Sequence, residues 1–361
     1  MLRTILIFLA VVFVVAGSAA GESNSAAFVF PGATSTAPSA EAALLDDAAD
    51  GRLDRHAFFP AALVAGGIAD PPTIEAYRRR FDHWVAELQT SGHVTGSVRD
   101  RVRAIHEFLH ARVLTGGFRA ASTTLGEAFE NGRFNCTSSV ILFRLTAERF
   151  GLSVGACEVP GHAYAEVAGE AGPIEVQTTC AAWFAAADDR AAQRNLLRSV
   201  VGDEAAAGGE RRHLSDLGLL AVVYYNRGVD AVEAGRYDEA LTLNRTALRL
   251  DPANRAARAN LLATVNNWSL EVGRRGDVGR AVALLETGLA YAPDYDLFYE
   301  NLVAMLQQRL SATTLQRATA DDVAMLRRSY DRWRSELVRR GALEAADEIA
   351  RRAAADPFLT P

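Results

Sequence analysis

The sequence predicts an α+β part followed by an all-helical part. The chain has 361 residues, which is more than one ordinary domain needs. Helical spacing of apolar residues gives way to short alternating segments before residue 180, and an alanine-rich helical pattern resumes after Ser215. We therefore expect helices and a small antiparallel sheet over residues 51–190, a linker over 191–215, and a helical domain over 216–356.

The first fifty residues combine an export pattern with a linker. Arg3 precedes an apolar run from Ile5 to Ala16, and small residues follow up to Ala20. This pattern predicts a signal peptide over residues 1–20 and a periplasmic or secreted protein. The alternative is an uncleaved membrane anchor, although a spanning helix needs about 20 apolar residues. Residues 21–50 are rich in Ala, Ser, Thr, Gly and Pro, which is typical of a linker.

Composition excludes some classes of partner. The chain is 49% hydrophobic and 23% charged, as a globular protein is, and its formal net charge is -6. No block of basic residues is present to neutralise phosphates, so we expect no nucleic-acid partner. We also expect no bound cofactor and no membrane insertion once the signal peptide is removed.

The expected order of elements in the first part is helices, then strands. Apolar residues recur at helical spacing after Pro71 and again from Val98, and a third, nearly all-apolar helix begins at Cys136 and ends at Gly151. Three short strands follow, with Gly and Pro between them, over residues 156–159, 162–167 and 174–178.

Cys136 is the candidate nucleophile. It stands where the third helix begins, and the free amides and macrodipole of a helix N-terminus stabilise a thiolate. The same amides are suited to hold an oxyanion. His162, on the second strand, is the candidate base. Glu175 and Gln177 share one face of the third strand, and either is able to orient the imidazole.

An internal repeat marks the second part. The first copy matches the small-residue, aromatic and proline positions of the tetratricopeptide motif, which repeats every 34 residues or so, at Tyr224, Gly228, Gly235, Tyr237, Ala240, Ala247 and Pro252. The second copy matches it at Gly276, Ala281, Leu285, Gly288 and Pro293. The proline of the second copy, Pro293, follows Pro252 by more than one repeat length, so we expect a long helix over about residues 255–272. A degenerate third copy opens at Asp296, and helices over 321–354 are expected to cap the array.

Such repeats stack into a surface that holds an extended peptide or a partner helix. We therefore expect a protein or peptide ligand on the helical domain. The alternative is an array that only braces its neighbour.

The motifs of the first part resemble those of bacterial transglutaminase-like proteins that carry tetratricopeptide repeats. The resemblance spans about Phe58 to Thr179 and rests on Asn135-Cys136-x-Ser138, Leu142-Phe143, Gly151-Leu152 and Pro160-Gly161-His162. It implies a papain-like fold, with Cys136 as nucleophile and His162 as base, acting on amide or peptide bonds by hydrolysis or transamidation.

One position departs from that family. Gln177 stands where relatives tend to have a carboxylate. An amide oxygen accepts a hydrogen bond from imidazole but does not stabilise imidazolium by charge, and Glu175 is a possible substitute. The competing hypothesis is therefore a non-catalytic protein whose degenerate domain binds peptide and whose repeats recruit a partner.

A second catalytic motif is present. His106-Glu107-Phe108-Leu109-His110 fits the H-E-x-x-H pattern of zinc peptidases. No third histidine follows at short spacing, so Glu127 or Glu130 would have to complete the site. We keep this as a minor alternative and expect no metal.

The chain has three cysteines, an odd number for an exported protein. Cys136 is the candidate free thiol. Cys157 and Cys180 remain open to two interpretations, a disulfide or two buried thiols.

Overall fold

The computed structural model describes residues 39–186, 189–312 and 320–360. Within these ranges the chain forms two compact units. The first ends at Arg227 and also includes residues 250–254, and the second comprises residues 228–249 and those from Arg255 onward. The predicted signal peptide lies outside the described residues. Among the helices that are described, none combines the length and the apolar character that crossing a bilayer requires.

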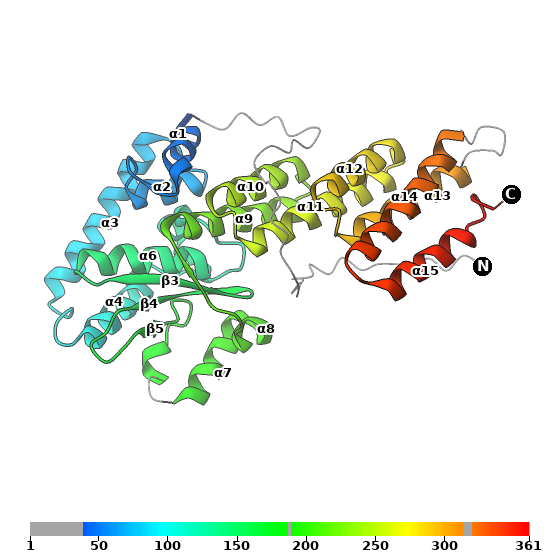
Figure 1. Cartoon of the computed structure of the whole chain (residues 1–361). Helices are drawn as coiled ribbons and strands as arrows, with labels where there is room; N and C mark the ends of the chain where they lie inside the picture. The colour runs from blue at the N-terminus through cyan, green and yellow to red at the C-terminus, as the bar shows by residue number, and fades with distance from the viewer. Residues whose placement is uncertain (1–38, 187–188, 313–319, 361) are drawn as a thin grey trace. The chain divides into compact units, whose positions relative to one another are not determined.

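The first unit combines helices with a small sheet, which confirms the predicted α+β class. Its helices before the sheet are α1 (Ser39–Asp47), α2 (Phe58–Ala65), α3 (Pro71–Ser91), α4 (Val98–Arg112), α5 (Leu125–Asn131) and α6 (Cys136–Arg149), with a 3-10 turn at Ala48–Asp50 (Figure 1). Later come a 3-10 turn at Trp183–Ala186 and the helices α7 (Arg190–Val201) and α8 (Asp203–Ala207).

The main sheet is antiparallel throughout and has the strand order β5-β4-β3-β6. Its strands are β3 (Val154–Val159), β4 (His162–Val167), β5 (Ile174–Val176) and β6 (Arg212–Leu214). A two-residue turn joins β3 to β4, so Val159 pairs directly with His162. Separately, the two-residue strands β1 (Gly117–Phe118) and β2 (Arg133–Phe134) pair in parallel.

Helix α6 forms the centre of the first unit. It packs against β3 and β4 and against α4 and α5, and its residues from Thr137 to Phe143 are all buried (Figure 1). A helix that is apolar nearly all round has no solvent face, which agrees with the sequence pattern. Burial of the helix fixes the position of its first residue, Cys136.

Two segments that we expected to be linkers contain regular structure. Residues 39–50 form α1 and a 3-10 turn, with Leu44 fully buried. Residues 191–215 contain most of α7, all of α8, and the strand β6, which pairs with β3. Strand β6 is only three residues long, so it shows no alternation of its own, and its structure comes from pairing with β3.

The second unit is built from helices. They are the end of α9 (Asp216–Glu233), α10 (Tyr237–Leu250), α11 (Arg255–Arg274), α12 (Val278–Tyr291), α13 (Asp296–Ala312), α14 (Ala320–Arg339) and α15 (Leu343–Ala354). From α11 to α15 each helix packs against the next one along the chain (Figure 1). The expected long helix after Asn254 is confirmed as α11.

Glycines in the second unit lie where helices approach closely. A Cβ atom on Gly228 would lie 2.8 Å from the Asn244 side chain, and one on Gly288 would lie 2.6 Å from the Phe298 ring. Helices α10 and α12 both end two residues before a proline, Pro252 and Pro293. The two prolines of the sequence repeat therefore occupy corresponding places, each just after the second helix of its copy.

Candidate active site

A side-chain cap places Cys136 at the start of α6. The Asn135 Oδ1 atom accepts hydrogen bonds from the backbone N–H groups of Thr137 (2.9 Å) and Ser138 (3.1 Å). The Ser138 hydroxyl accepts in return from the Asn135 backbone N–H at 3.0 Å. This reciprocal cap is encoded by the local sequence Asn-Cys-Thr-Ser, and it makes Cys136 the first residue of the helix.

The cap is itself fixed to the loop that follows β1. Asn135 Nδ2 donates to the Ala120 carbonyl (3.0 Å) and to Thr123 Oγ1 (2.9 Å). Ser138 Oγ also donates to the Ser122 carbonyl at 2.8 Å. Buried, fully bonded polar groups of this kind hold one arrangement, so the thiol has a defined position.

The cap changes one expectation about the helix amides. We expected the free amides at the N-terminus of α6 to be available for an oxyanion. The amides of Thr137 and Ser138 already donate to Asn135, so that expectation is wrong for these two groups.

His162 is the first residue of β4 and its side chain is buried, with 4% exposed. Cys136 is half-buried, and each of the two side chains shifts the pKa of the other, as ionisable groups that lie close together do. The Nε2 atom of His162 is engaged by Gln177, whereas Nδ1 has no hydrogen-bonding partner among the described protein atoms. The nitrogen left for the thiol is therefore Nδ1. The structure brings together the two residues that the sequence proposed as nucleophile and base.

The His162 imidazole, Gln177 and Glu175 are joined in that order by hydrogen bonds. His162 Nε2 lies 2.7 Å from Gln177 Oε1, and Gln177 Nε2 donates to Glu175 Oε1 at 2.7 Å. The sequence left open which of the two orients the histidine. In the structure Gln177 contacts the ring and Glu175 contacts Gln177.

This series of hydrogen bonds determines the protonation of the ring. An ionised carboxylate only accepts, so the amide NH2 of Gln177 must point toward Glu175 and its oxygen toward His162. The amide oxygen also only accepts, so Nε2 of His162 must carry a proton. In the neutral ring, Nδ1 is then the basic nitrogen. The exposed carboxylate of Glu175 thus controls which nitrogen is free to take the thiol proton.

The pKa values of the pair move in opposite directions. Burial by itself raises the pKa of Cys136, but the His162 side chain, with smaller contributions from the Ala163 backbone and the Thr137 hydroxyl, lowers it below its ordinary value. Burial by itself lowers the pKa of His162, but Cys136, Gln177 and Glu175 together raise it. Both shifts favour the thiolate–imidazolium form of the pair.

Residues of α9 also reach this region, and the sequence did not predict them. Asn226 Nδ2 donates to Thr137 Oγ1 at 3.0 Å, and the Tyr225 hydroxyl donates to Glu158 Oε1 at 2.7 Å. Arg212 pairs with the same Glu158 carboxylate at 2.6 Å. These contacts join residues far apart in the chain, and no local pattern marks them.

The H-E-x-x-H residues have structural roles here. His110 Nε2 hydrogen-bonds the Thr178 carbonyl at 3.0 Å, next to Gln177, and His106 packs edge-on against Phe184. Burial, with a smaller effect of His110, lowers the pKa of His106 to about 3. Glu107 is exposed.

The two glutamates that a zinc site would have needed are hydrogen-bonded to other side chains. Glu130 accepts from Tyr77 and Glu127 from Ser122. Among the described residues, the only gathering of three or more metal-ligating side chains does not include His106 or His110.

The three cysteines are free thiols, so no disulfide joins Cys157 and Cys180. Cys157 is buried on β3, with its sulfur 3.3 Å from Nδ1 of His213 on β6. His213 is a residue that the sequence analysis did not single out.

Comparison of the chain with models of known protein families found no match, and comparison with curated proteins found no similar protein.

Proposed function

We propose that this protein is a cysteine-dependent acyl-transfer enzyme that attacks amide or peptide bonds. The observation that carries the proposal is the hydrogen-bonded series His162–Gln177–Glu175, because it leaves Nδ1 of His162 as the unbonded, basic nitrogen of a side chain that lowers the pKa of the Cys136 thiol. A buried cysteine or histidine with only a packing role does not need a partner that fixes its tautomer. Gln177 thus fills the orienting role in this chain.

The reaction follows from the roles of these side chains. The Cys136 sulfur, having given its proton to Nδ1 of His162, adds to the carbonyl carbon of the substrate. The backbone N–H of Cys136 is the helix-terminal amide that we assign to the resulting oxyanion. The imidazolium then protonates the leaving amine as the C–N bond breaks, and a thioester remains on Cys136. Attack by water releases an acid, and attack by an amine gives a new amide.

The proposal extends to family and location. The capped Cys136 helix followed by an antiparallel hairpin that carries His162 supports membership among transglutaminase-like, papain-like proteins. The successive helix pairs of the second unit support a tetratricopeptide array that binds a protein or peptide. The export pattern of residues 1–20 supports action in the periplasm or outside the cell.

Acylation by a simple active ester tests the proposal without knowledge of the natural substrate. The purified chain is mixed with p-nitrophenyl acetate. A burst of nitrophenol equal to the enzyme concentration is expected, with one acetyl group found on Cys136 by peptide mass spectrometry. Adding a primary amine then tests transamidation, since faster loss of the acetyl group with formation of an amide product indicates an amine acceptor.

Matched variants make the result decisive. Cys136→Ser is expected to remove the burst, and His162→Ala to slow it, whereas Cys180→Ser is expected to keep it, because Cys180 is a buried thiol outside the pair. If Cys136 is acetylated no faster than in the His162→Ala variant, the acyl-transfer proposal fails and the non-catalytic binding protein is favoured.

A further inference from the structure

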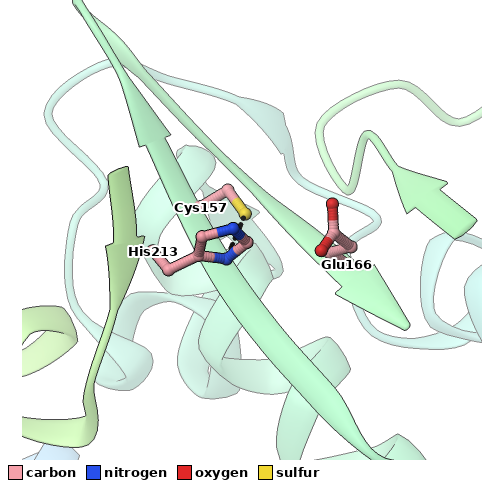
Figure 2. A group of neighbouring side chains, drawn as sticks. All are labelled: Cys157, Glu166 and His213. Carbon is pink, nitrogen blue, oxygen red and sulfur yellow. Dashed lines mark hydrogen bonds between the residues drawn. The ribbon is translucent and has the colours of Figure 1, made fainter. Parts of the chain in front are cut away.

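A second group of polar side chains lies on the sheet, outside the Cys136 pair. Cys157, Glu166 and His213 come from three neighbouring strands, β3, β4 and β6 (Figure 2). Cys157 stands directly opposite His213, and Glu166 stands opposite Gly155, two residues before Cys157 on the same strand. Since residues two apart on a strand share a face, all three side chains lie on one face of the sheet.

The ligand atoms of this group are close together. The Cys157 sulfur lies 3.3 Å from His213 Nδ1, and one ligand atom from each of the three residues lies within 4.8 Å of the other two. In a tetrahedral zinc site, metal–ligand bonds of about 2.0–2.3 Å put neighbouring ligand atoms about 3.5 Å apart. The thiol and imidazole are close to this separation, and the carboxylate, within 4.8 Å of both, has to move closer to reach it.

From this geometry we infer that Cys157, Glu166 and His213 form a binding site for a divalent transition-metal ion of the zinc type. One thiolate, one imidazole and one carboxylate form a donor set of mixed softness, which suits Zn²⁺ and Co²⁺ better than Mg²⁺ or Ca²⁺. Binding forms a metal–sulfur bond and breaks the S–H bond of Cys157, and the proton leaves to solvent.

The surroundings allow an ion to enter and to be held. Cys157 is buried, Glu166 is half-buried and His213 is exposed, so the site is closed on the sheet side and open toward solvent. Three protein ligands leave a fourth position for water or another small ligand. Arg211 pairs with Oε2 of Glu166 at 2.9 Å, which leaves Oε1 of that carboxylate for the metal.

The ion would fasten β6 to the rest of the sheet. Strand β6 is only three residues long and pairs with β3 alone, so it has few backbone hydrogen bonds of its own. A metal bridging His213 to Cys157 and Glu166 links β6 to both strands of the central hairpin. Because the ion binds the folded chain, it is expected to raise the melting temperature of the protein.

Cobalt titration of the full chain tests the site. Cys136→Ser is used as the background so that the other thiol–imidazole pair cannot supply a cysteine ligand. After treatment with a chelator, the protein is titrated with Co²⁺ in the presence of a phosphine reductant. One equivalent is expected to bind with a sulfur-to-cobalt absorption in the near ultraviolet, and Zn²⁺ is expected to displace it.

Substitutions assign the ligands. In that background His213→Gln and Glu166→Gln are each expected to weaken binding by more than about tenfold, and Cys157→Ser to remove the sulfur absorption. Cys180→Ser is the control, because it removes a buried thiol outside the cluster and is expected to keep the absorption. His213 is exposed, so its variant tests the site even if Cys157→Ser fails to fold.

Three results would each overturn the inference. The first is the lack of stoichiometric cobalt binding to the folded protein. The second is a His213→Gln variant that binds cobalt with unchanged affinity and keeps the sulfur absorption. The third is a sulfur absorption that is lost in the Cys180→Ser variant but kept in the Cys157→Ser variant. A metal that binds without raising the melting temperature would reject the proposed fastening of β6.

Discussion

The first unit contains two thiol–imidazole pairs that differ in what surrounds them. Cys136 begins a helix, and its partner His162 is buried and held by Gln177. Cys157 lies within a strand, and its partner His213 is exposed. Burial and the nearby Glu166 raise the pKa of Cys157, whereas His162 outweighs burial and lowers the pKa of Cys136.

The comparison shows that proximity of sulfur and nitrogen does not by itself make a nucleophile. The Cys157–His213 pair has a short contact of 3.3 Å, yet a carboxylate beside the sulfur disfavours the thiolate. At Cys136 the carboxylate of Glu175 lies behind the imidazole and reaches it through Gln177, where it favours the imidazolium. The position of the negative charge is therefore the reason why we propose acyl transfer for one pair and metal binding for the other.

The largest expected effect comes from exchanging the nucleophile. Cys136→Ser is expected to lower ester or amide turnover by about 10⁴-fold or more, because a serine hydroxyl beside this imidazole lacks the acidity of the thiol. Cys157→Ser is expected to keep turnover within about threefold of the unmodified chain. Steady-state kinetics with an active ester measure both. Equal losses in the two variants would remove the distinction between the pairs.

Removal of the imidazole is the next largest change. His162→Ala leaves burial as the main influence on Cys136, so the thiol pKa is expected to rise and turnover to fall by about 10³-fold. Alkylation of Cys136 at about pH 6.5 is expected to slow by about tenfold. His213→Ala is the matched change in the other pair. If it slows Cys136 alkylation as much as His162→Ala does, the two pairs are not independent.

Gln177→Leu tests the orienting amide at nearly constant volume. It removes the acceptor for Nε2 of His162, so both ring tautomers become available and Nδ1 is no longer the fixed base. We expect kcat to fall by about 10²-fold with KM little changed. Gln177→Asn, which keeps an amide on a shorter side chain, is the control and is expected to retain more activity. A Leu variant with unchanged kcat would show that the amide has only a packing role.

The smallest effect is expected from removing the negative charge of Glu175. Glu175→Gln keeps a hydrogen-bond acceptor for Gln177 but removes the negative charge that helps to raise the pKa of His162. The imidazolium should then lose its proton at lower pH, so the alkaline limb of the kcat profile should move to lower pH. Because Glu175 is exposed, we expect a shift of less than about one unit that shrinks further at high salt. A shift to higher pH would contradict the assigned sign.

Features encoded by nearby residues were predictable from the sequence. The start of a helix at Cys136, the Pro-Gly turn before His162 and the long helix after Asn254 all follow from local chemistry, and each is found at the expected place. The strand expected over residues 174–178 ends at Val176, but Glu175 and Gln177 still lie together. Local patterns therefore located both members of the proposed catalytic pair.

Features that depend on distant residues could not be predicted. Strand β6 is too short to show alternation and exists only by pairing with β3, and so the Cys157–His213 contact had no sequence signal. The same is true of Tyr225 and Asn226, which reach Glu158 and Thr137 from α9. The order Gln177 first, Glu175 second also required coordinates, since the sequence pattern predicted both residues on one face of the same strand.

The pH dependence of alkylation at Cys136 tests the thiolate–imidazolium pair most directly. The rate at this residue is followed by peptide mass spectrometry with iodoacetamide in the folded chain and compared with an ordinary thiol, whose pKa is about 8.5. We expect the rate at Cys136 to stay high down to about pH 6 and to lose this plateau in His162→Ala. A rate that instead rises with a single ordinary thiol titration, and is the same with and without His162, would contradict the assignment of Cys136 as an activated nucleophile.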